Sequence, residues 1–337
     1  MQGVPGAAGA DGPLAIGIVT YNRAGYLRDL LSSARALQTP PTWIVVVDNA
    51  STDGTAALLA DARGWFPDGM LHVRRLEANT GGSGGFSEAT RVALELGADW
   101  VWLMDDDVEI LPESLDRFHP WMERFWCLHG RRYDVDGSPF YWQSRINNVL
   151  GVPLPYNLKD FNAEGFAVTN SGTFEGMLVH REVVRRIGLP DPRFFITWDD
   201  AVYAWLAAQY CEVAYVDAFV LKRKREQRQI EIVFRHFNDA SPLYRFHVMR
   251  NRAYVARYFA EYGKLNRVGF ATGTVLTLGK ELFRLVAVEH TVRGIQPLAR
   301  GMRESRRLLR DPSWRPMDPF EGALAPDPPR SDDREKL

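Results

Sequence analysis

Short apolar runs alternate with amphipathic stretches along the first hundred residues, and this pattern predicts a βαβ arrangement. The runs expected to be strands are residues 14–20, 43–48, 71–76 and 100–104. The stretches expected to be helices are residues 24–37, 52–62 and 85–96. Because right-handed crossovers place the carboxyl ends of such strands at one sheet edge, the polar residues that follow them are expected to meet there.

The pattern is looser in the middle of the chain. Residues 119–170 carry many aromatic side chains among prolines and polar turns, which indicates an aromatic-lined lobe that binds sugar faces, or else a small satellite core. Order returns with a predicted strand over 173–180 and helices over 182–187 and 199–209. An apolar helical stretch follows over 268–288.

Composition narrows the class of protein. The chain has 337 residues, 46% hydrophobic and 25% charged, which is typical of an α/β enzyme, and its net charge of −1 argues against a nucleic-acid partner. Two cysteines, Cys127 and Cys211, are too few for a disulfide framework, so a reducing cytoplasm is expected. Residues 1–13 lack signal-peptide features and are expected to be a flexible lead-in, and no apolar run reaches the roughly 18 residues of a spanning helix.

Three consecutive carboxylates end the apolar run at residues 100–104. Asp105, Asp106 and Asp107 would emerge together at the carboxyl edge of the sheet, where acidic oxygens suit a hard divalent cation shared with substrate phosphates. A solvated acidic loop with a helix cap is the simpler alternative.

A glycine-rich loop lies between the predicted strand 71–76 and the helix that follows it. Residues 79–86 read Asn-Thr-Gly-Gly-Ser-Gly-Gly-Phe, which fits neither the dinucleotide fingerprint nor a P-loop. Glycines before a helix still allow the backbone to approach a ligand closely, and the free N–H groups of the helix suit an anion or sugar hydroxyls. A tight turn without a ligand is the alternative.

A second acidic pair, Asp199 and Asp200, follows Trp198 at the start of a predicted helix. One of the two carboxylates could cap the helix. An ionised carboxylate whose pKa is adjusted by partial burial is also what a general base needs to deprotonate a sugar hydroxyl.

These motifs, taken in order, resemble the inverting glycosyltransferases of family two. The matching segments are residues 20–23, 48–55, 79–86, 105–107, 170–176 and 195–201. The glycine loop and the Trp-Asp-Asp-Ala segment are most similar to bacterial galactofuranosyltransferases and rhamnosyltransferases. The resemblance implies a GT-A fold, a Rossmann-like mixed sheet flanked by helices, over residues 14–235, a helical region over 236–315 and a disordered tail over 316–337.

The resemblance also implies roles for single residues. Asp200 would be the catalytic base, with Asp199 beside it, and Trp198 and Glu175 would contact the acceptor. Asp107 and Asp105 would hold a divalent metal, Mn²⁺ or Mg²⁺, on the diphosphate, with His236 as a further ligand. The residues implied to bind the nucleotide sugar are Thr20, Tyr21, Asn22, Arg23, Asp48, Asn79, Gly81, Gly82, Asp105, Asp106 and Arg250.

One position departs from the family pattern. Lys222 falls where a metal-binding histidine usually stands, and a protonated lysine cannot ligate a metal. Either Lys222 contacts the diphosphate and weakens the metal requirement, or His236 or His247 supplies the ligand. Because the carboxylate triplet is intact, we expect metal binding to be retained.

The arginine-rich stretch after residue 290 leaves two interpretations. Next to the apolar helix 268–288, it suits peripheral binding to an anionic membrane surface, which would bring the enzyme to a polyprenyl-linked or other glycan acceptor. A solvated helix face that packs on the catalytic domain is the alternative. In either case the C-terminal third is expected to be helical and peripheral to the chemistry. No repeat or heptad predicts an oligomeric state.

Three functions are compatible with the sequence. The leading one is transfer of galactofuranose from UDP-galactofuranose, with dTDP-rhamnose as the alternative donor. A nucleotidyltransferase would also pair an α/β sheet with acidic metal ligands, but it would carry a basic glycine-rich signature where this chain has residues 20–23. A silent sugar-nucleotide binding protein is conceivable because of Lys222, although Asp199 and Asp200 argue against it.

Overall fold

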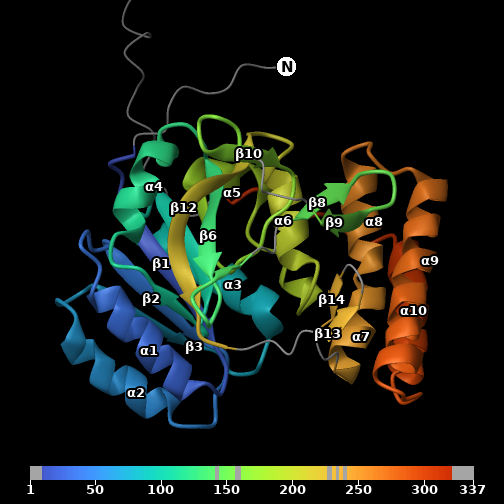
Figure 1. The fold of residues 1–337 in the computed structure, drawn as a ribbon, viewed down its shortest axis with the longest axis horizontal. Coiled ribbons are helices and arrows are strands. Elements are labelled where there is room, and N and C mark those ends of the chain that lie inside the picture. Colours follow the sequence, from blue (N-terminus) through green and yellow to red (C-terminus); the bar gives the residue numbers. More distant parts are fainter. Residues whose placement is uncertain are drawn as a thin grey trace, which may run out of the picture.

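The computed structural model describes residues 10–140, 144–155, 161–225 and 241–320 in full, and only the backbone of 230–232 and 235–237. A curled mixed sheet with helices on both faces forms most of the molecule, and a group of helices lies to one side of it (Figure 1). The prediction of a mixed α/β sheet with a C-terminal helical region is therefore confirmed. Predicted metal ligand His236 has its side chain outside the residues described in full.

Eight strands follow one another across the main sheet in the order β10-β12-β6-β11-β4-β1-β2-β3, while β5 pairs with β12 and β7 with β6. The strands of this sheet are β1 (Leu14–Thr20), β2 (Trp43–Asp48), β3 (Leu71–Arg75), β4 (Trp100–Asp105), β5 (Val108–Ile110), β6 (Cys127–Tyr133), β7 (Pro139–Phe140), β10 (Phe166–Thr169), β11 (Met177–His180) and β12 (Val213–Arg223). Two small hairpins lie outside it, β8 (Ser144–Asn147) with β9 (Val152–Pro155), and β13 (Ile230–Ile232) with β14 (Arg235–Phe237).

Strand direction brings the polar segments to one edge of the sheet. β1 runs parallel to β2 and β4, and β2 runs parallel to β3. β11 is antiparallel to both β4 and β6, so β6 and its parallel neighbour β12 run in the same direction as β4. The carboxyl ends of these strands therefore share an edge with the segment that precedes β11, as expected for a ligand site.

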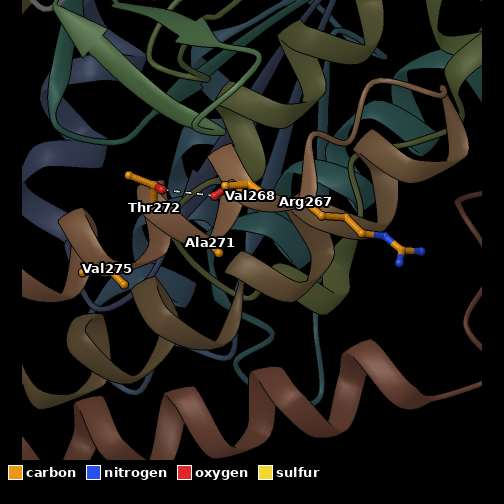
Figure 2. A pocket seen from close by; sticks show the side chains of 5 residues that line it. All are labelled: Arg267, Val268, Ala271, Thr272 and Val275. Carbon is orange, nitrogen blue, oxygen red and sulfur yellow. Dashed lines mark hydrogen bonds between the residues drawn. The ribbon is translucent and has the colours of Figure 1, made fainter.

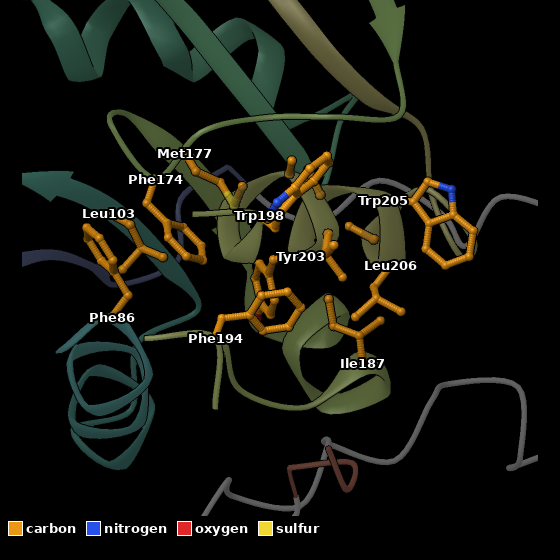
Figure 3. Close-up of a cluster of buried hydrophobic side chains, with 14 of the residues drawn as sticks. Phe86, Leu103, Phe174, Met177, Ile187, Phe194, Trp198, Tyr203, Trp205 and Leu206 are labelled. Atoms are coloured by element: carbon orange, nitrogen blue, oxygen red, sulfur yellow. The ribbon is translucent and has the colours of Figure 1, made fainter. Parts of the chain in front are cut away.

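Helices cover both faces because the strands are apolar on both sides. The helices are α1 (Ala24–Arg35), α2 (Thr55–Ala62), α3 (Gly81–Glu95), α4 (Ser114–Met122), α5 (Arg181–Ile187), α6 (Asp199–Ala207), α7 (Pro242–Arg250), α8 (Arg252–Glu261), α9 (Arg267–Phe283) and α10 (Ile295–Arg310), with short 3₁₀ turns at Arg63–Trp65 and Pro192–Phe194 and a π turn at Arg284–Val288. Residues of α1, α2 and α4 share one buried cluster with alternate β1 residues. Residues of α3, α5, α6 and α7 share the cluster on the other face, part of which Figure 3 shows around Phe174 and Tyr203.

Several boundaries differ from the expected ones. The glycine loop is already helical from Gly81, so α3 begins earlier than predicted. Residues 127–133 and 166–169, which were expected in a separate aromatic lobe, are strands β6 and β10 of the main sheet. Residues 141–143 and 156–160 of that region lie outside the described residues.

The segment after α10 folds back onto the domain. Trp314 is 9% exposed, and the backbone N–H of Met317 donates a hydrogen bond to the Tyr258 hydroxyl at 3.3 Å. Phe320 packs against the buried cluster on the α3 face. Residues 316–320 of the predicted disordered tail thus contact the core, whereas residues 321–337, like residues 1–9 of the predicted lead-in, lie outside the described part. Among the described helices, none combines the length and the apolar character needed to cross a membrane.

Candidate functional site

The carboxylate triplet lies at the end of β4, and its three members have different surroundings. The Thr20 hydroxyl donates a hydrogen bond to Oδ2 of Asp106 at 2.7 Å, and the carboxylate is 2% exposed. Nη1 of Arg23 contacts Oδ1 of Asp106 at 2.9 Å and Oδ2 of Asp107 at 3.0 Å. Thr20 and Asp106, predicted to bind the nucleotide sugar, are thus buried against each other, and Asp106 also pairs with Arg23.

Asp105 carries the strongest electrostatic strain of the triplet. Burial raises its pKa well above the ordinary value, and the neighbouring charges of Asp107, Glu175 and Asp106 raise it further, while Arg23 partly offsets them. Arg23 is the arginine that contacts Asp106 and Asp107, and its single charge does not balance the three carboxylates of the triplet. Such a site favours an added cation.

The donor types at this edge fit a hard divalent cation, because carboxylate oxygens are its preferred ligands. Asp105 and Asp107 would hold it. Among the residues described in full, no three His, Cys, Asp or Glu side chains converge on one point. The protein would therefore supply only part of the coordination shell, and substrate phosphates and water would complete it, as Mg²⁺ sites often require.

Glu175 lies between two buried arginines. Nη1 of Arg132 contacts its Oε2 at 3.0 Å, and Nε of Arg223 contacts its Oε1 at 3.3 Å. Arg223 also contacts Oδ1 of Asp134 at 3.3 Å. Glu175, predicted to bind the acceptor, is thus engaged by two guanidinium groups.

The residue of β12 that reaches these carboxylates is Arg223, although the sequence singled out Lys222. Lys222 pairs in register with Glu109 of β5 and Tyr133 of β6, and its side chain is only partly buried. The pairing of β12 with β6 is irregular between Tyr215 and Leu221. An irregularity of this kind changes which side chains face inward, and this explains the shift by one residue.

The turns after β1 and β2 are bound to each other. Oδ1 of Asn22 accepts the Thr52 N–H at 2.7 Å, and the Asn22 N–H donates to the Ser51 hydroxyl at 2.9 Å. Tyr21 is 43% exposed beside this turn, where an aromatic face could stack on a base. These contacts fix the two turns as one wall of the candidate nucleotide site.

Asp48 is buried inside this wall. Its carboxylate accepts the Ser51 N–H at 2.8 Å and contacts Nη1 of Arg75 at 2.9 Å, and the residue is 1% exposed. The prediction placed Asp48 against the base, but in this structure it presents Arg75 at the sheet edge. Arg75 ends β3, directly opposite Asp48 in register, so strand pairing could have identified it.

The glycine loop joins the nucleotide wall to the second acidic pair. Oδ1 of Asn49 accepts the Thr80 N–H at 2.9 Å, and its amide donates to the Gly81 carbonyl at 2.8 Å. Asn79 is exposed, and its Oδ1 accepts the Gly81 N–H at 2.8 Å. A Cβ on Gly81, which has a φ of +74°, would meet the Phe195 carbonyl oxygen at 2.0 Å. Gly81 thus allows two protein loops to touch, whereas Gly82 leaves open space at the start of α3, where a ligand could approach.

Asp199 and Asp200 begin α6, and both residues are partly buried. The Ser83 hydroxyl donates to Oδ2 of Asp199 at 2.8 Å, and the Ala201 N–H donates to Oδ1 of Asp200 at 2.7 Å. Burial raises the pKa of both carboxyls, and for Asp200 the adjacent charge of Asp199 adds to burial and brings the pKa to about 7. A carboxylate with a pKa near neutrality is suited to accept and release a proton at physiological pH.

Thr173 connects the two acidic groups. Its hydroxyl hydrogen-bonds to the Asp200 carboxylate and accepts the Glu175 N–H at 3.2 Å. The Thr173 N–H donates to Nε2 of His129 at 3.3 Å, and burial lowers the pKa of this histidine to about 3, so the ring is neutral. The charge of Glu175 in turn raises the pKa of Asp105, so Thr173 and Glu175 lie between Asp200 and the triplet as electrostatic neighbours of both.

The loop before α6 has a strained backbone. Phe195, Thr197 and Trp198 have φ values of 65°, 63° and 71°. Asn22 and Ala50, in the turns described above, are also in this left-handed region, so five of the six non-glycine residues with positive φ in the described chain lie around the candidate site. Strain of this kind persists only where surrounding contacts impose it, and it is concentrated at functional sites.

The α7–α8 junction imposes that strain. The Asn251 amide is fully buried and donates to the carbonyls of Phe194, Ile196 and Thr197, each at 2.9 Å. Arg250 donates to the Phe194 carbonyl at 2.8 Å and also to that of Arg193. Arg250, predicted to face the diphosphate, therefore holds the loop in this structure. The helical region, expected to be peripheral to the chemistry, supports the candidate base directly.

Trp198 and His247 likewise support the loop from within the protein. The Trp198 indole N–H donates to the Val248 carbonyl at 3.0 Å, and the side chain is 7% exposed, so its ring does not present a face to an acceptor. Figure 3 shows this ring among the buried side chains of the α3-face cluster. The His247 ring stacks on Phe195 at 4.9 Å, and burial and Arg250 lower its pKa to about 4.

Sequence reasoning missed several residues that build this site: Arg75, Ser83, Arg132, Thr173, Arg223 and Asn251. Of these, Thr173 lies within segment 170–176 and Ser83 within the glycine loop 79–86, both of which the sequence did single out. The others act over contacts between residues far apart in the chain. Together the residues form an edge with the joined turns after β1 and β2, a negatively charged centre and the partly buried Asp200, whose pKa is about 7.

Comparisons with known proteins agree with this geometry. The sequence model described as "Glycosyl transferase family 2" matches residues 15–188. The galactofuranosyltransferase GlfT1 of Mycolicibacterium smegmatis is 28% identical over 200 residues, and GlfT1 of Mycobacterium tuberculosis is 37% identical over 198 residues. Each match covers 54% of this chain and 61% or 60% of the relative, so the similarity extends over less than two thirds of these relatives.

Two solved structures share the fold. TarS of S. aureus has a TM-score of 0.50 with 18% identity and covers 82% of this chain and 44% of its own. GalNAc-T7, solved with UDP, GalNAc and Mn²⁺, has a TM-score of 0.52 with 14% identity and covers 74% of this chain and 50% of its own. At these identities the likeness concerns the fold, and the predicted GT-A architecture is confirmed.

Proposed function

The chain belongs to glycosyl transferase family 2, and from that premise we propose that it transfers galactofuranose from UDP-galactofuranose to a hydroxyl group of a glycan, with inversion at the anomeric carbon. The galactofuranosyltransferases among its relatives support the choice of sugar. The UDP held by the structural neighbour GalNAc-T7 supports a uridine nucleotide as the carrier.

The observation that carries the proposal is the environment of Asp200. Burial and Asp199 bring its pKa to about 7, and the Thr173 hydroxyl and the Ala201 N–H hold the carboxylate in place. In the reaction, Asp200 accepts the proton of the acceptor hydroxyl as its oxygen attacks the anomeric carbon. The bond from that carbon to the nucleoside diphosphate breaks on the opposite face, and inversion follows.

The turns after β1 and β2 and the carboxylate triplet would bind the nucleoside diphosphate, which is the leaving group. Tyr21 and the joined turns after β1 and β2 would receive the base and ribose. In the first turn of α3 the N–H groups of Gly81 and Ser83 are bonded within the protein, and Gly82 would donate its N–H to a phosphate. Asp105 and Asp107 would hold a divalent cation, Mn²⁺ or Mg²⁺, which when bound offsets the charge that develops on the diphosphate. The excess of carboxylates around Asp105 supports this assignment.

The acceptor and the place of action belong to the proposal as well. We expect a lipid-linked or cell-surface glycan as the acceptor, with the enzyme working at the cytoplasmic face of the membrane. For proton transfer, the acceptor hydroxyl and the Asp200 carboxylate must meet in one orientation. The strained loop at Phe195–Trp198 would favour this by keeping Asp200 fixed.

The test is release of nucleoside diphosphate from a panel of UDP- and dTDP-sugars, with polyprenyl-linked glycan acceptors, in the presence of Mn²⁺ or EDTA. We expect release from UDP-galactofuranose that needs the acceptor and that EDTA abolishes. Release only from dTDP-rhamnose would replace the donor in the proposal. Tight donor binding without release from any member of the panel would instead support a sugar-nucleotide binding protein, and EDTA-resistant release would contradict the role of Asp105 and Asp107.

A further inference from the structure

The outward face of α9 is apolar and exposed over its whole length. Val268 is 79% exposed, Val275 67%, Leu276 55% and Phe283 51%, and Val286 in the following π turn is 64% exposed. Residues 268, 272, 275, 279, 283 and 286 follow one another at helical spacing with Leu276 beside them, and we name this set the α9 stripe; it is apolar except for Thr272, and Gly279 adds no side chain to it.

The start of the stripe is hollowed. A depression of about 500 Å³ is lined by Arg267, Val268, Ala271, Thr272 and Val275 (Figure 2). The Thr272 hydroxyl donates to the Val268 carbonyl at 3.1 Å, so even this polar side chain is satisfied within the helix. The surface here accordingly offers hydrocarbon and little capacity for hydrogen bonds.

The opposite face of α9 is fixed to the protein. Phe270 is 8% exposed, and a Cβ on Gly273 would meet the Leu150 carbonyl oxygen at 2.0 Å. Glu281 is fully buried, with Nε of Arg245 and Nη1 of Arg284 each 3.7 Å from its carboxylate. These contacts allow only one orientation of the helix, which is the one that exposes the stripe.

Charge in the segment from residue 264 to residue 310, which contains the stripe, is one-sided. Residues 264–310 contain ten Lys or Arg and three Glu, in a chain whose net charge is −1. None of the three Glu is exposed, whereas nine of the basic residues are. The exposed basic residues are Lys264, Arg267, Lys280, Arg293, Arg300, Arg303, Arg306, Arg307 and Arg310. In Figure 1, α9 and α10 both lie on the side of the helical region that is turned away from the sheet.

We propose that the α9 stripe and the exposed arginines of α10 dock the protein on an anionic lipid bilayer. Apolar side chains that enter the interface next to arginines that meet lipid headgroups are the features of a helix lying in a membrane surface. A nucleic acid would use the arginines and leave the stripe in water. A second copy packed through the same face would bring like charges together, which is unfavourable.

Membrane docking by this surface does not depend on which sugar is transferred, and it rests on the proposed function only for its purpose. A lipid-linked acceptor lies in the plane of a membrane, so docking by this face would confine the enzyme near its substrate and raise the effective concentration of acceptor. Vesicle binding itself needs neither donor nor turnover, and the two proposals can therefore fail separately.

The experiment is flotation of the full chain with vesicles of phosphatidylcholine alone or of equal parts phosphatidylcholine and phosphatidylglycerol. We expect binding to the anionic vesicles that weakens with salt. The double variant Val275→Asp with Phe283→Asp should lower the partition coefficient by about tenfold or more, because it removes two inserting apolar side chains. Arg303→Glu with Arg306→Glu and Arg307→Glu should abolish the preference for anionic lipid.

A matched control reverses three exposed arginines elsewhere, Arg28, Arg35 and Arg63 on the α1–α2 side, and should leave binding unchanged. Circular dichroism melts and nucleotide release with a water-soluble acceptor analogue show that each variant folds. Absence of vesicle binding at low salt in a chain that still releases nucleotide would overturn the docking surface alone. A dimer in light scattering that the double Asp variant dissociates, without vesicle binding, would also overturn it by assigning the stripe to a second copy.

Discussion

Replacing Asp200 with Asn should abolish transfer and at the same time stabilise the folded chain at alkaline pH. The carboxyl pKa lies at about 7 in the folded protein, compared with an ordinary value of 3.8. Because the folded pKa is raised, the unfolded chain ionises first as the pH rises, and the folded state loses stability between about pH 4 and pH 7. Above pH 7 the loss is complete, at about 4 kcal/mol for a shift of this size.

Asn has the same shape and no charge to ionise. It can keep the hydrogen bond from the Ala201 N–H and offer its amide to the Thr173 hydroxyl, so most of the local packing remains. Relative to wild type, we expect Asp200→Asn to gain about 3 kcal/mol more in free energy of unfolding at pH 8 than at pH 5. Urea unfolding at the two pH values measures this difference directly.

The same variant should show no transfer at any pH, while wild-type kcat/KM should rise with pH toward a plateau above about pH 7. Asp136→Asn removes an exposed carboxyl far from Asp200 and should change neither quantity. An Asp200→Asn enzyme that keeps its turnover, or that gains no stability between pH 5 and pH 8, would refute the reasoning about this carboxyl.

Three further substitutions probe how the loop around Asp200 is held. Ser83→Ala removes the hydrogen bond that lowers the Asp199 pKa, so Asp199 should keep its proton to higher pH and repel the Asp200 charge less. The acid limb of the pH–rate profile should therefore move to lower pH. Ser32→Ala is the control, and an unchanged profile in Ser83→Ala would contradict the coupling of the two carboxyls. Asn251→Ala removes a donor from three carbonyls, of which that of Phe194 keeps its bond from Arg250, and should cost about 1–3 kcal/mol of stability and reduce kcat more than it raises KM for the donor. Loss of the α9 cap in Asn266→Ala should cost stability alone, and an equal effect of both variants on kcat would rule out the positioning role. In Gly81→Ala the new Cβ would clash with the Phe195 carbonyl, so this substitution should disrupt both loops. Gly64→Ala places its Cβ in open space and should be tolerated in melting and activity assays. A fully active Gly81→Ala enzyme would show that the two loops need not touch.

The parallel part of the sheet could be predicted because its strands are covered on both faces. β1, β2 and β4 appear as continuous apolar runs, and the polar residues at their carboxyl ends do gather at one edge. β12 was harder. It continues to Arg223 through an irregular pairing with β6, and no local pattern shows which side chains face inward after such an irregularity.

The chemistry of single residues was predicted less well than their neighbourhood. Trp198 and Arg250 belong to the site region, but contacts over about fifty residues of sequence turn both of them inward. Asn251 carries no motif, since its importance arises from three carbonyls that only the strained loop brings together. Asp200, in contrast, could be singled out because it belongs to an acidic pair that stands beside aromatic residues at the start of a helix.

The most direct test of the central claim is the anomeric configuration of the product, followed by NMR during transfer from UDP-galactofuranose. The account predicts that the new glycosidic bond has the configuration opposite to that in the donor, and that Asp200→Asn forms no such bond. A product with the configuration of the donor would contradict a single displacement assisted by Asp200 as the base.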